Sequence, residues 1–585
     1  MKYPTLKELN TSRELIDVFK GYNHTLRIGS GEFYDMTNLS SDSYPVLSPR
    51  SKRGVYDSPG IPQGMVAKDA LCYVDGGNFI INGYPVSMGL TVDKDENGKT
   101  IPKTLISMGA YVIIMPDKKY INTANLSDHG RIEAGMSTSA STTFELCTVG
   151  GASYKDVKVQ GTPPTNPKNM DMWIDTSETP HQLKQYSSTT EMWSDVTTTY
   201  IKISSPGIGL PFSVEDGVTI TGVEGIDDLK SPTNAVIWAK GNDFIVVKGI
   251  LEAVKTQTTS IMVERRMPHM DFIIESENRL WGCRYGPAIN GQIVNEIYAS
   301  KLGDFKNWNC FMGISTDSYV APVGTDGQFT GAITHLGYPL FFKETCLHKV
   351  YGNYPANYQI QTTACRGVQK GCGKSLAIVN EVLYYKARSG VCAYDGSLPV
   401  EMSSALGDTS YHDAVAGSLG NKYYISMKDD HDSYSLFVYD SRKDMWHRED
   451  DTEVAQFCNC RGDLYYIDYA DKQIKTVKGT GDAETAPIKW QAVTGIIGTD
   501  SPDKKYISRM DVRMSLSIGS RVSFYAEYDS SGEWEYLFTM DGVKLQTFAV
   551  PIRPQRCDHL RLKILGQGDA KIYSICKTIE QGSDA

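Results

Sequence analysis

The chain has 585 residues, of which 22% are charged and 41% hydrophobic, and its formal net charge is −10. This is the composition of an ordinary globular chain, and its acidic balance argues against a protein that wraps nucleic acid, which needs a basic face. An acidic channel wall would still let DNA pass without sticking. The 35 tyrosines and 53 glycines suit half-buried strands and frequent turns, so we predict an all-β fold.

Residues 1–60 are predicted to form an N-terminal arm or platform element. Residues 1–19 lack the apolar core of a signal peptide, and no apolar run approaches the ~20 residues of a transmembrane helix. These features predict synthesis in the cytoplasm and no membrane insertion. The 12 cysteines are then expected to be free thiols, and Cys458 and Cys460 to be alternate residues on one strand face instead of zinc ligands.

Residues 61–124 and 266–480 are predicted to form a β-propeller. Between residues 331 and 478 an apolar strand, a tight turn and an aromatic pair recur, with the turns at Gly337, Asn380, Asn421 and Gly462. Their spacings of 43, 41 and 41 residues fit the ~40–45 residues of a four-stranded blade. Weaker copies of the pattern begin near residues 71, 105 and 272, which indicates six or seven blades.

Residues 125–265 break this period and are predicted to be inserted β modules exposed at a propeller loop. The segment is rich in Thr, Ser, Pro and Gly, and a pair of Trp-containing strands surrounds Trp173 and Trp193. Trp173, Tyr186 and Trp193 are candidate glycan contacts, because aromatic residues with polar tips suit sugar platforms. The alternative is that they form the core of the small module.

Residues 485–585 are predicted to form a C-terminal β-sandwich, preceded by a linker at residues 478–482. Apolar residues alternate with polar ones from 509 to 516 and again from 522 to 528, and this strict period of two predicts strands with one buried face. The fold class is therefore all-β, a β-propeller with an inserted small β domain and a C-terminal β-sandwich.

Several segments resemble tail proteins of bacteriophages. Residues 29–50 (GSGEFYDMTNLSSDSYPVLSPR) are similar to the opening of such proteins, and residues 278–282 (NRLWG) with 297–305 (IYASKLGDF) are similar to a propeller motif of tail hub and nozzle proteins. Residues 551–559 (PIRPQRCDH) also resemble that family. The likeness covers about two thirds of the chain but not residues 125–265. It is to the tail nozzle or hub of short-tailed phages (tail tubular protein B-like, or stabilisation, proteins).

This resemblance implies a structural virion protein without enzymatic activity, catalytic residues, cofactors or metals. It implies a ring, expected to be a homohexamer, that docks on a tail adaptor, anchors fibres or spikes, and lets double-stranded DNA pass without specific binding. The expected location is the virion tail. Candidate subunit-interface residues are Gly31, Glu32, Phe33, Asp35, Arg50, Arg553, Arg556 and His559.

Two other functions compete with a structural ring: a glycan-binding receptor protein, and a glycoside hydrolase. Residues 371–375 (GCGKS) resemble the end of a phosphate-binding loop, but Val368 stands where that loop needs glycine, so we predict an inter-blade loop. Residues 461–463 (RGD) are explained by a tight turn. Sialidase-type boxes and the HExxH pattern are not found in the sequence, and a catalytic carboxylate pair cannot be located from sequence alone.

Overall fold

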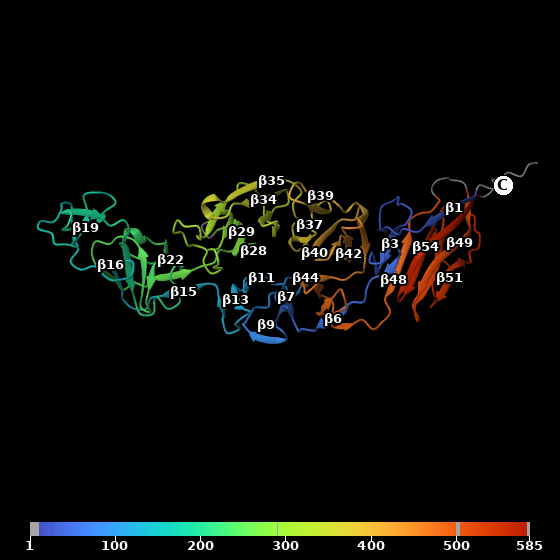
Figure 1. The fold of residues 1–585 in the computed structure, drawn as a ribbon, viewed down its shortest axis with the longest axis horizontal. Helices are drawn as coiled ribbons and strands as arrows, with labels where there is room; N and C mark the ends of the chain where they lie inside the picture. Colours follow the sequence, from blue (N-terminus) through green and yellow to red (C-terminus); the bar gives the residue numbers. More distant parts are fainter. Residues whose placement is uncertain (1–10, 97, 289–290, 499–503, 582–585) are drawn as a thin grey trace, which may run out of the picture.

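The computed structural model describes residues 11–96, 98–288, 291–498 and 504–581. The molecule is elongated, with the propeller in the middle, the inserted domain at one end and the C-terminal sandwich at the other (Figure 1). Among the described residues the regular elements are strands and four short 3₁₀ turns: η1 (Asp227–Leu229), η2 (Pro355–Asn357), η3 (Gly373–Ser375) and η4 (Ser404–Leu406).

In the described part of the chain, seven four-stranded antiparallel blades make up the propeller. The first blade consists of β7 (Pro62–Ala67), β8 (Leu71–Asp75), β9 (Asn78–Ile81) and β10 (Tyr84–Ser87). The second consists of β11 (Thr104–Met108), β12 (Tyr111–Met115), β13 (Lys119–Asn122) and β14 (His129–Arg131). The third consists of β28 (Phe272–Ser276), β29 (Arg279–Pro287), β30 (Ile293–Ala299) and β31 (Tyr319–Pro322). The fourth blade consists of β32 (Gly331–His335), β33 (Tyr338–Phe342), β34 (Cys346–Tyr351) and β35 (Gln359–Ala364). The fifth consists of β36 (Ala377–Val379), β37 (Val382–Lys386), β38 (Val391–Tyr394) and β39 (Val400–Glu401).

The last two blades join the propeller to other parts of the chain. The sixth blade consists of β40 (Tyr411–Leu419), β41 (Lys422–Asp429), β42 (Tyr434–Asp440) and β43 (Met445–Arg448). The seventh consists of β44 (Val454–Cys460), β45 (Asp463–Asp468), β46 (Ile474–Thr476) and β6 (Gly54–Asp57). Strand β6 pairs with β46 and leads directly into β7, so the N-terminal segment closes the ring. Residues 54–57, predicted as part of an arm, thus belong to a blade.

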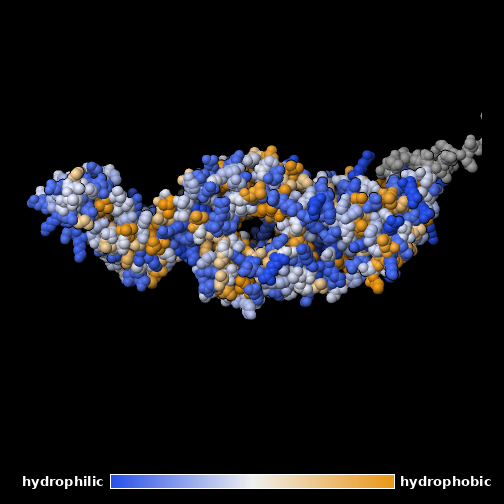
Figure 2. Space-filling model, in the orientation of Figure 1, coloured by the Kyte–Doolittle hydropathy of each residue, from blue (hydrophilic) through white to orange (hydrophobic). Residues whose placement is uncertain are grey.

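The first strands of the blades lie around a central opening, which is visible as a dark hole in Figure 2. Strand β44 contacts β7, β7 contacts β11, and the series continues through β28 and β32. Side-chain amides fasten neighbouring inner strands: Gln456 exchanges two hydrogen bonds with the backbone of Met65, and Asn459 Nδ2 donates to Ser418 O over 2.8 Å. Because each blade covers its neighbour's apolar face, only a closed ring leaves no such face exposed.

The inserted domain leaves the propeller after β14 and returns before β28. One sheet holds β15 (Ala134–Ser137), β27 (Met262–Arg265), β22 (Gly217–Thr221) and β23 (Thr233–Val236), and a second holds β24 (Ala239–Lys240), β25 (Phe244–Lys248), β21 (Tyr200–Ser204), β16 (Thr142–Cys147) and β26 (Lys255–Gln257). A third, smaller sheet holds β17 (Lys158–Gln160), β18 (Met172–Asp175), β19 (Gln182–Ser187) and β20 (Met192–Asp195). It lies at the free end of the molecule (Figure 1).

The C-terminal sandwich continues the sheet of the sixth blade. Beyond β43 this sheet adds β2 (Gly21–Tyr22), β3 (Glu32–Thr37), β48 (Lys489–Thr494), β53 (Leu560–Gln567), β50 (Arg521–Tyr528) and β51 (Glu535–Asp541). The second sheet of the sandwich consists of β1 (Thr11–Ile16), β54 (Ala570–Gln581), β49 (Lys505–Leu516) and β52 (Gln546–Val550). Two short pairings remain: β4 (Leu39–Ser40) pairs with β5 (Ser48–Pro49), and β47 (Asp482–Ala483) pairs with β6.

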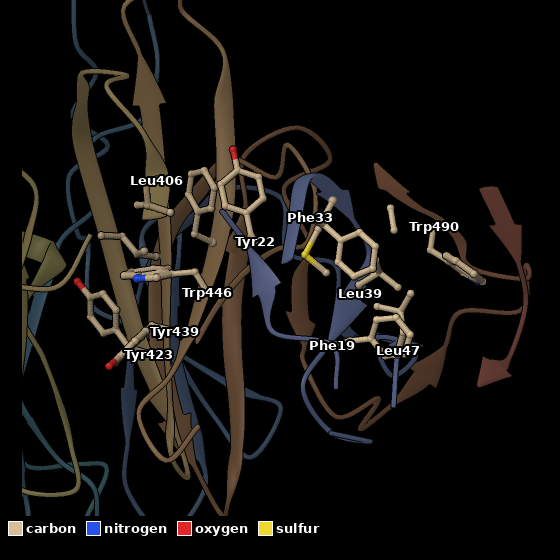
Figure 3. Close-up of a cluster of buried hydrophobic side chains, with 14 of the residues drawn as sticks. Phe19, Tyr22, Phe33, Leu39, Leu47, Leu406, Tyr423, Tyr439, Trp446 and Trp490 are labelled. Carbon is tan, nitrogen blue, oxygen red and sulfur yellow. The ribbon is translucent and has the colours of Figure 1, made fainter. Parts of the chain in front are cut away.

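A single hydrophobic core runs from the fourth, fifth and sixth blades into the sandwich. Tyr22 and Trp446 lie on the propeller side of this core, and Phe33 and Trp490 lie on the sandwich side (Figure 3). The alternation predicted for residues 509–516 is observed, since Met510, Val512, Met514 and Leu516 are buried. The predicted fold class, a β-propeller with an inserted β domain and a C-terminal sandwich, is confirmed.

Candidate functional site

The small sheet β17–β20 at the free end of the insert presents an aromatic face to solvent. Its opposite face packs Met172, Ile174 and Leu183 against Leu146 of β16, which anchors the sheet to the rest of the insert. Because side chains alternate along a strand, the residues between those positions point outward. The sequence thus folds into a platform with one anchored face and one free face.

The strand register brings the three aromatic residues together on the free face. Tyr186 of β19 lies directly opposite Trp193 of β20, and Trp173 of β18 lies opposite Lys184. The ring centroids of Trp173 and Trp193 are 5.3 Å apart in an edge-on arrangement, and those of Tyr186 and Trp193 are also 5.3 Å apart. Three residues separated by up to 20 positions in the chain therefore form one cluster.

The members of this cluster differ in what they offer a ligand. Trp173 is only 3% exposed, and its Nε1–H donates to Gln160 O over 2.8 Å, so no ring can stack directly on it. Its position beneath Trp193 makes it a support, which corrects the expectation of direct contact. Trp193 and Tyr186 are half-buried and keep part of their rings in water.

Charged side chains border the aromatic cluster. Lys184 Nζ lies 5.4 Å from the ring centroid of Trp173, 3.0 Å from Asp175 Oδ2 and 3.9 Å from Asp195 Oδ1. Hydrogen bonds from Ser177 and Lys184 lower the pKa of Asp175 to about 2. A flat apolar surface bordered by fixed donors and acceptors is what a sugar ring requires, since the sugar has both C–H faces and hydroxyl edges.

The predicted subunit-interface residues fall into two separate regions. Phe33 is buried in the core, Asp35 accepts a hydrogen bond from Gln491, and Arg50 pairs with Glu484 at 2.9 Å, so this first group holds the chain's own segments together. Glu32 also bonds within the chain, to Asn23, and Gly31 lies beside Val18. The second group, Arg553, Arg556 and His559, lies in the segment between β52 and β53 of the sandwich, and His559 bonds Ser530.

The glycine-rich segment at 371–375 is a connection between blades, as its sequence indicated. Its residues Gly373–Ser375 form η3, which contacts the inner strands β32 and β40. Ser375 Oγ accepts a hydrogen bond from Lys386 N, and Cys372 Sγ accepts one from Ala414 N. These bonds commit the polar groups of the segment to the propeller instead of a phosphate.

Lys374 in this connection has an unusual environment. Its side chain is exposed, yet desolvation by the surrounding protein lowers the pKa of its ammonium to about 8. A side chain combines both properties where protein surrounds it on several sides but water still reaches it, as at a concave wall. The ammonium is therefore more often neutral at pH 8 than that of an ordinary lysine, whose pKa is near 10.4.

We expect Lys374 to be acylated about tenfold faster than exposed lysines such as Lys370 at pH 8. At that pH about half of its amines are neutral, against less than about 1% for an ordinary lysine, and lower intrinsic nucleophilicity offsets part of this gain. Trace labelling with acetic anhydride, followed by peptide mass spectrometry, measures both rates in one sample. Equal rates for Lys374 and Lys370 would contradict the expected environment.

Within residues 11–96, 98–288, 291–498 and 504–581, no group of three or more His, Cys, Asp or Glu side chains is placed to hold a metal ion. The 12 cysteines are free thiols. No helix in the described segments is long and apolar enough to cross a membrane.

No protein-family model matches the sequence, and no curated protein is significantly similar to it. Among solved structures, an exo-β-1,3-galactanase from Phanerochaete chrysosporium is similar over 52% of this chain and 94% of its own, with 7% identity and a TM-score of 0.19. Chaetomium thermophilum Raptor is similar over 74% and 30%, with 9% identity and a TM-score of 0.28. Trypanosoma rangeli sialidase is similar over 97% and 95%, with 9% identity and a TM-score of 0.20.

These comparisons contradict two of our predictions. The similar structures are glycan-processing enzymes and Raptor, not viral tail proteins, so the predicted structural ring of a phage tail and the prediction that the chain is not an enzyme are not retained. At identities of 7–9% the likeness concerns the fold alone and assigns no activity. The predicted partners and location stay predictions, because none of these structures bears on them.

Proposed function

We propose that this protein binds glycan chains on the free aromatic face of the sheet β17–β20. One observation carries the proposal: the fold places Trp193 and Tyr186 side by side on a solvent-facing strand surface, supported from beneath by the buried Trp173. The distant similarity to glycan-processing enzymes adds nothing to it.

The placement of this face suits a ligand of extended form. The sheet lies at the end of the long axis, away from the propeller and sandwich, so a polymer could cross it without meeting another domain (Figure 1). The rim holds both a cation, Lys184, and two carboxylates, Asp175 and Asp195, so their summed charge does not demand a strongly anionic ligand. Neutral hydroxyls, which both donate and accept, match such a rim.

Replacing Trp193 with alanine is expected to weaken glycan binding at least tenfold, about 1.4 kcal/mol, because the stacking surface is lost. Binding of the full-length protein to a panel of immobilised neutral polysaccharides, followed by titration with the best binder, measures the change. The Trp193→Phe variant retains a ring and should keep most of the affinity. The Tyr84→Ala variant removes an exposed aromatic from the first blade and should bind like the wild type.

Unchanged binding by both Trp193→Ala and Tyr186→Ala would exclude this face as the binding surface. Assaying the same incubations for newly formed reducing ends determines whether bound chains are also cleaved. Thermal melting of each variant shows whether the small sheet is still folded.

A further inference from the structure

A cavity lies where the inserted domain meets the third blade. Its volume is about 440 Å³, within the ~300–1,000 Å³ range of small-molecule sites. Trp238 and Asn234 line it from the insert, and Asn309 and Phe311 line it from the loop that follows β30. Two aromatic residues from different domains thus border one open cavity.

Rigid contacts hold the two walls of this cavity in place. A Cβ on Gly217 would lie 2.2 Å from Asn309 O, so the backbones of β22 and the blade loop are in direct contact. Asn307 Oδ1 accepts a hydrogen bond from Gly217 N over 3.0 Å, and Asn307 Nδ2 donates to Asp216 Oδ1 over 3.0 Å. The buried ion pair between Arg265 and Asp216 completes this junction. The cavity is therefore preformed, which lowers the entropic cost of binding.

The polar groups of the cavity are available to a ligand. Within the described segments of the chain, Trp238 Nε1, the Asn309 amide and Lys248 Nζ have no protein partner, and Asn234 uses only its amide oxygen, as acceptor for Thr219. Asp228 accepts one backbone hydrogen bond, from Ile250 N over 2.6 Å, and a carboxylate can accept several.

A different cavity of about 550 Å³, between the N-terminal segment and the last two blades, shows the contrast. There Lys422 pairs with Asp42 at 2.7 Å and Arg53 with Glu449 at 2.6 Å. Lys443 likewise pairs with Asp440. Charges that satisfy one another in this way make a structural joint, whereas the donors around Trp238 and Phe311 have no hydrogen-bond partner among the described residues.

We propose that the cavity at the junction of insert and propeller binds one neutral pyranose unit of a glycan. The rings of Trp238 and Phe311 would contact the C–H faces of the sugar, while the two asparagines and Lys248 donate to its hydroxyls and Asp228 accepts from them. The charged lining residues, Asp228 and Lys248, balance one another, which favours an uncharged ligand. This inference rests on the proposed function and adds a second glycan subsite, which is formed by residues other than those of the outer face.

The test uses the full-length protein and methyl glycosides of glucose, galactose, mannose and N-acetylglucosamine, with binding followed by saturation-transfer NMR. The Trp193→Ala variant serves as background, because it removes the outer face and leaves the cavity intact. In that background, Phe311→Ala or Asn234→Ala should reduce binding at least tenfold. The Ile314→Ala variant is the matched control, since Ile314 is 46% exposed on the same loop as Phe311, at 49%, but does not line the cavity.

The outcomes separate the two sites. Binding that survives Trp193→Ala and is lost with Phe311→Ala, but not with Ile314→Ala, supports the cavity whatever happens at the outer face. Absence of monosaccharide binding in the Trp193→Ala variant, or full binding after Phe311→Ala, overturns the cavity proposal. In either case polysaccharide binding by the Phe311→Ala single variant reports on the outer face alone, so the proposed function is judged independently.

Discussion

Replacing Gly54 with valine should open the propeller ring and lower the free energy of unfolding by about 3 kcal/mol. Gly54 begins β6, the strand that the N-terminal segment contributes to the seventh blade. A Cβ at this position would lie 2.5 Å from Thr480 O and 2.8 Å from Gly479 C, and both are backbone atoms. Because β6 is hydrogen-bonded on both sides, to β46 and to β47, it cannot move away without losing one partner.

Hydrogen exchange provides the most direct measurement of this opening. Amides of β46 and of β7 should exchange faster in Gly54→Val, while those of the insert keep their wild-type rates, because the strain is confined to the closure. Gly324→Val is the matched control, since a Cβ there meets nothing within 4 Å. Equal urea midpoints and exchange rates for the two variants would show that β6 does not fasten the ring.

The blades could be predicted from sequence because each one is a local unit. The aromatic pairs at Tyr384–Tyr385, Tyr423–Tyr424 and Tyr465–Tyr466 each follow a tight turn and are buried between neighbouring blades. Each blade therefore needs a buried aromatic pair at the same place, and this need recurs at a fixed spacing in the sequence. Their regular period is enough to identify a propeller. The weaker copies at residues 71, 105 and 272 correspond to the first three blades of the structure.

Contacts between distant segments could not be predicted in the same way. Strand β6 has only four residues, and nothing in its composition indicates that its partner, β46, lies more than 400 positions away. Likewise β2 and β3 join the sixth blade to the sandwich through a sheet whose order mixes both ends of the chain. The pairing of β2 and β3 with their distant partners depends on the packed core around Phe33 and Trp490, and no periodicity in the sequence indicates it.

The two sites illustrate the same limit. Trp173, Tyr186 and Trp193 were recognisable because they lie within 21 residues of one another and their strands alternate. Trp238 and Phe311 are far apart in sequence and each lies in an unremarkable segment, so only the docking of the insert on the third blade brings them together.

Acidification should destabilise the folded protein strongly between pH 6.5 and 5, because two histidines are buried in neutral form. His447 is 1% exposed; desolvation lowers its pKa to about 3, and nearby Lys422 adds to this effect. His348 is fully buried between Thr325 and Thr362, and desolvation together with Lys343 lowers its pKa to about 4. In the unfolded chain both titrate near 6.5. Below that pH the histidines bind protons in the unfolded state but not in the folded state, so the free energy of unfolding decreases as the pH falls.

The contribution of each histidine rises toward about 1.4 kcal/mol per pH unit as the unfolded chain becomes protonated, and the two together should lower the free energy of unfolding by about 3 kcal/mol between pH 6.5 and 5. Carboxylates such as Asp450, whose pKa is lowered despite desolvation because Arg53 lies beside it, reduce the stability further only at lower pH.

Urea unfolding at several pH values measures how steeply the free energy of unfolding depends on pH, and His447→Gln and His348→Gln should each remove about half of that slope. His431→Gln, at an exposed loop position, is the matched control. A wild-type slope retained in both buried-site variants would mean that these rings accept protons in the folded protein, which their desolvation should prevent.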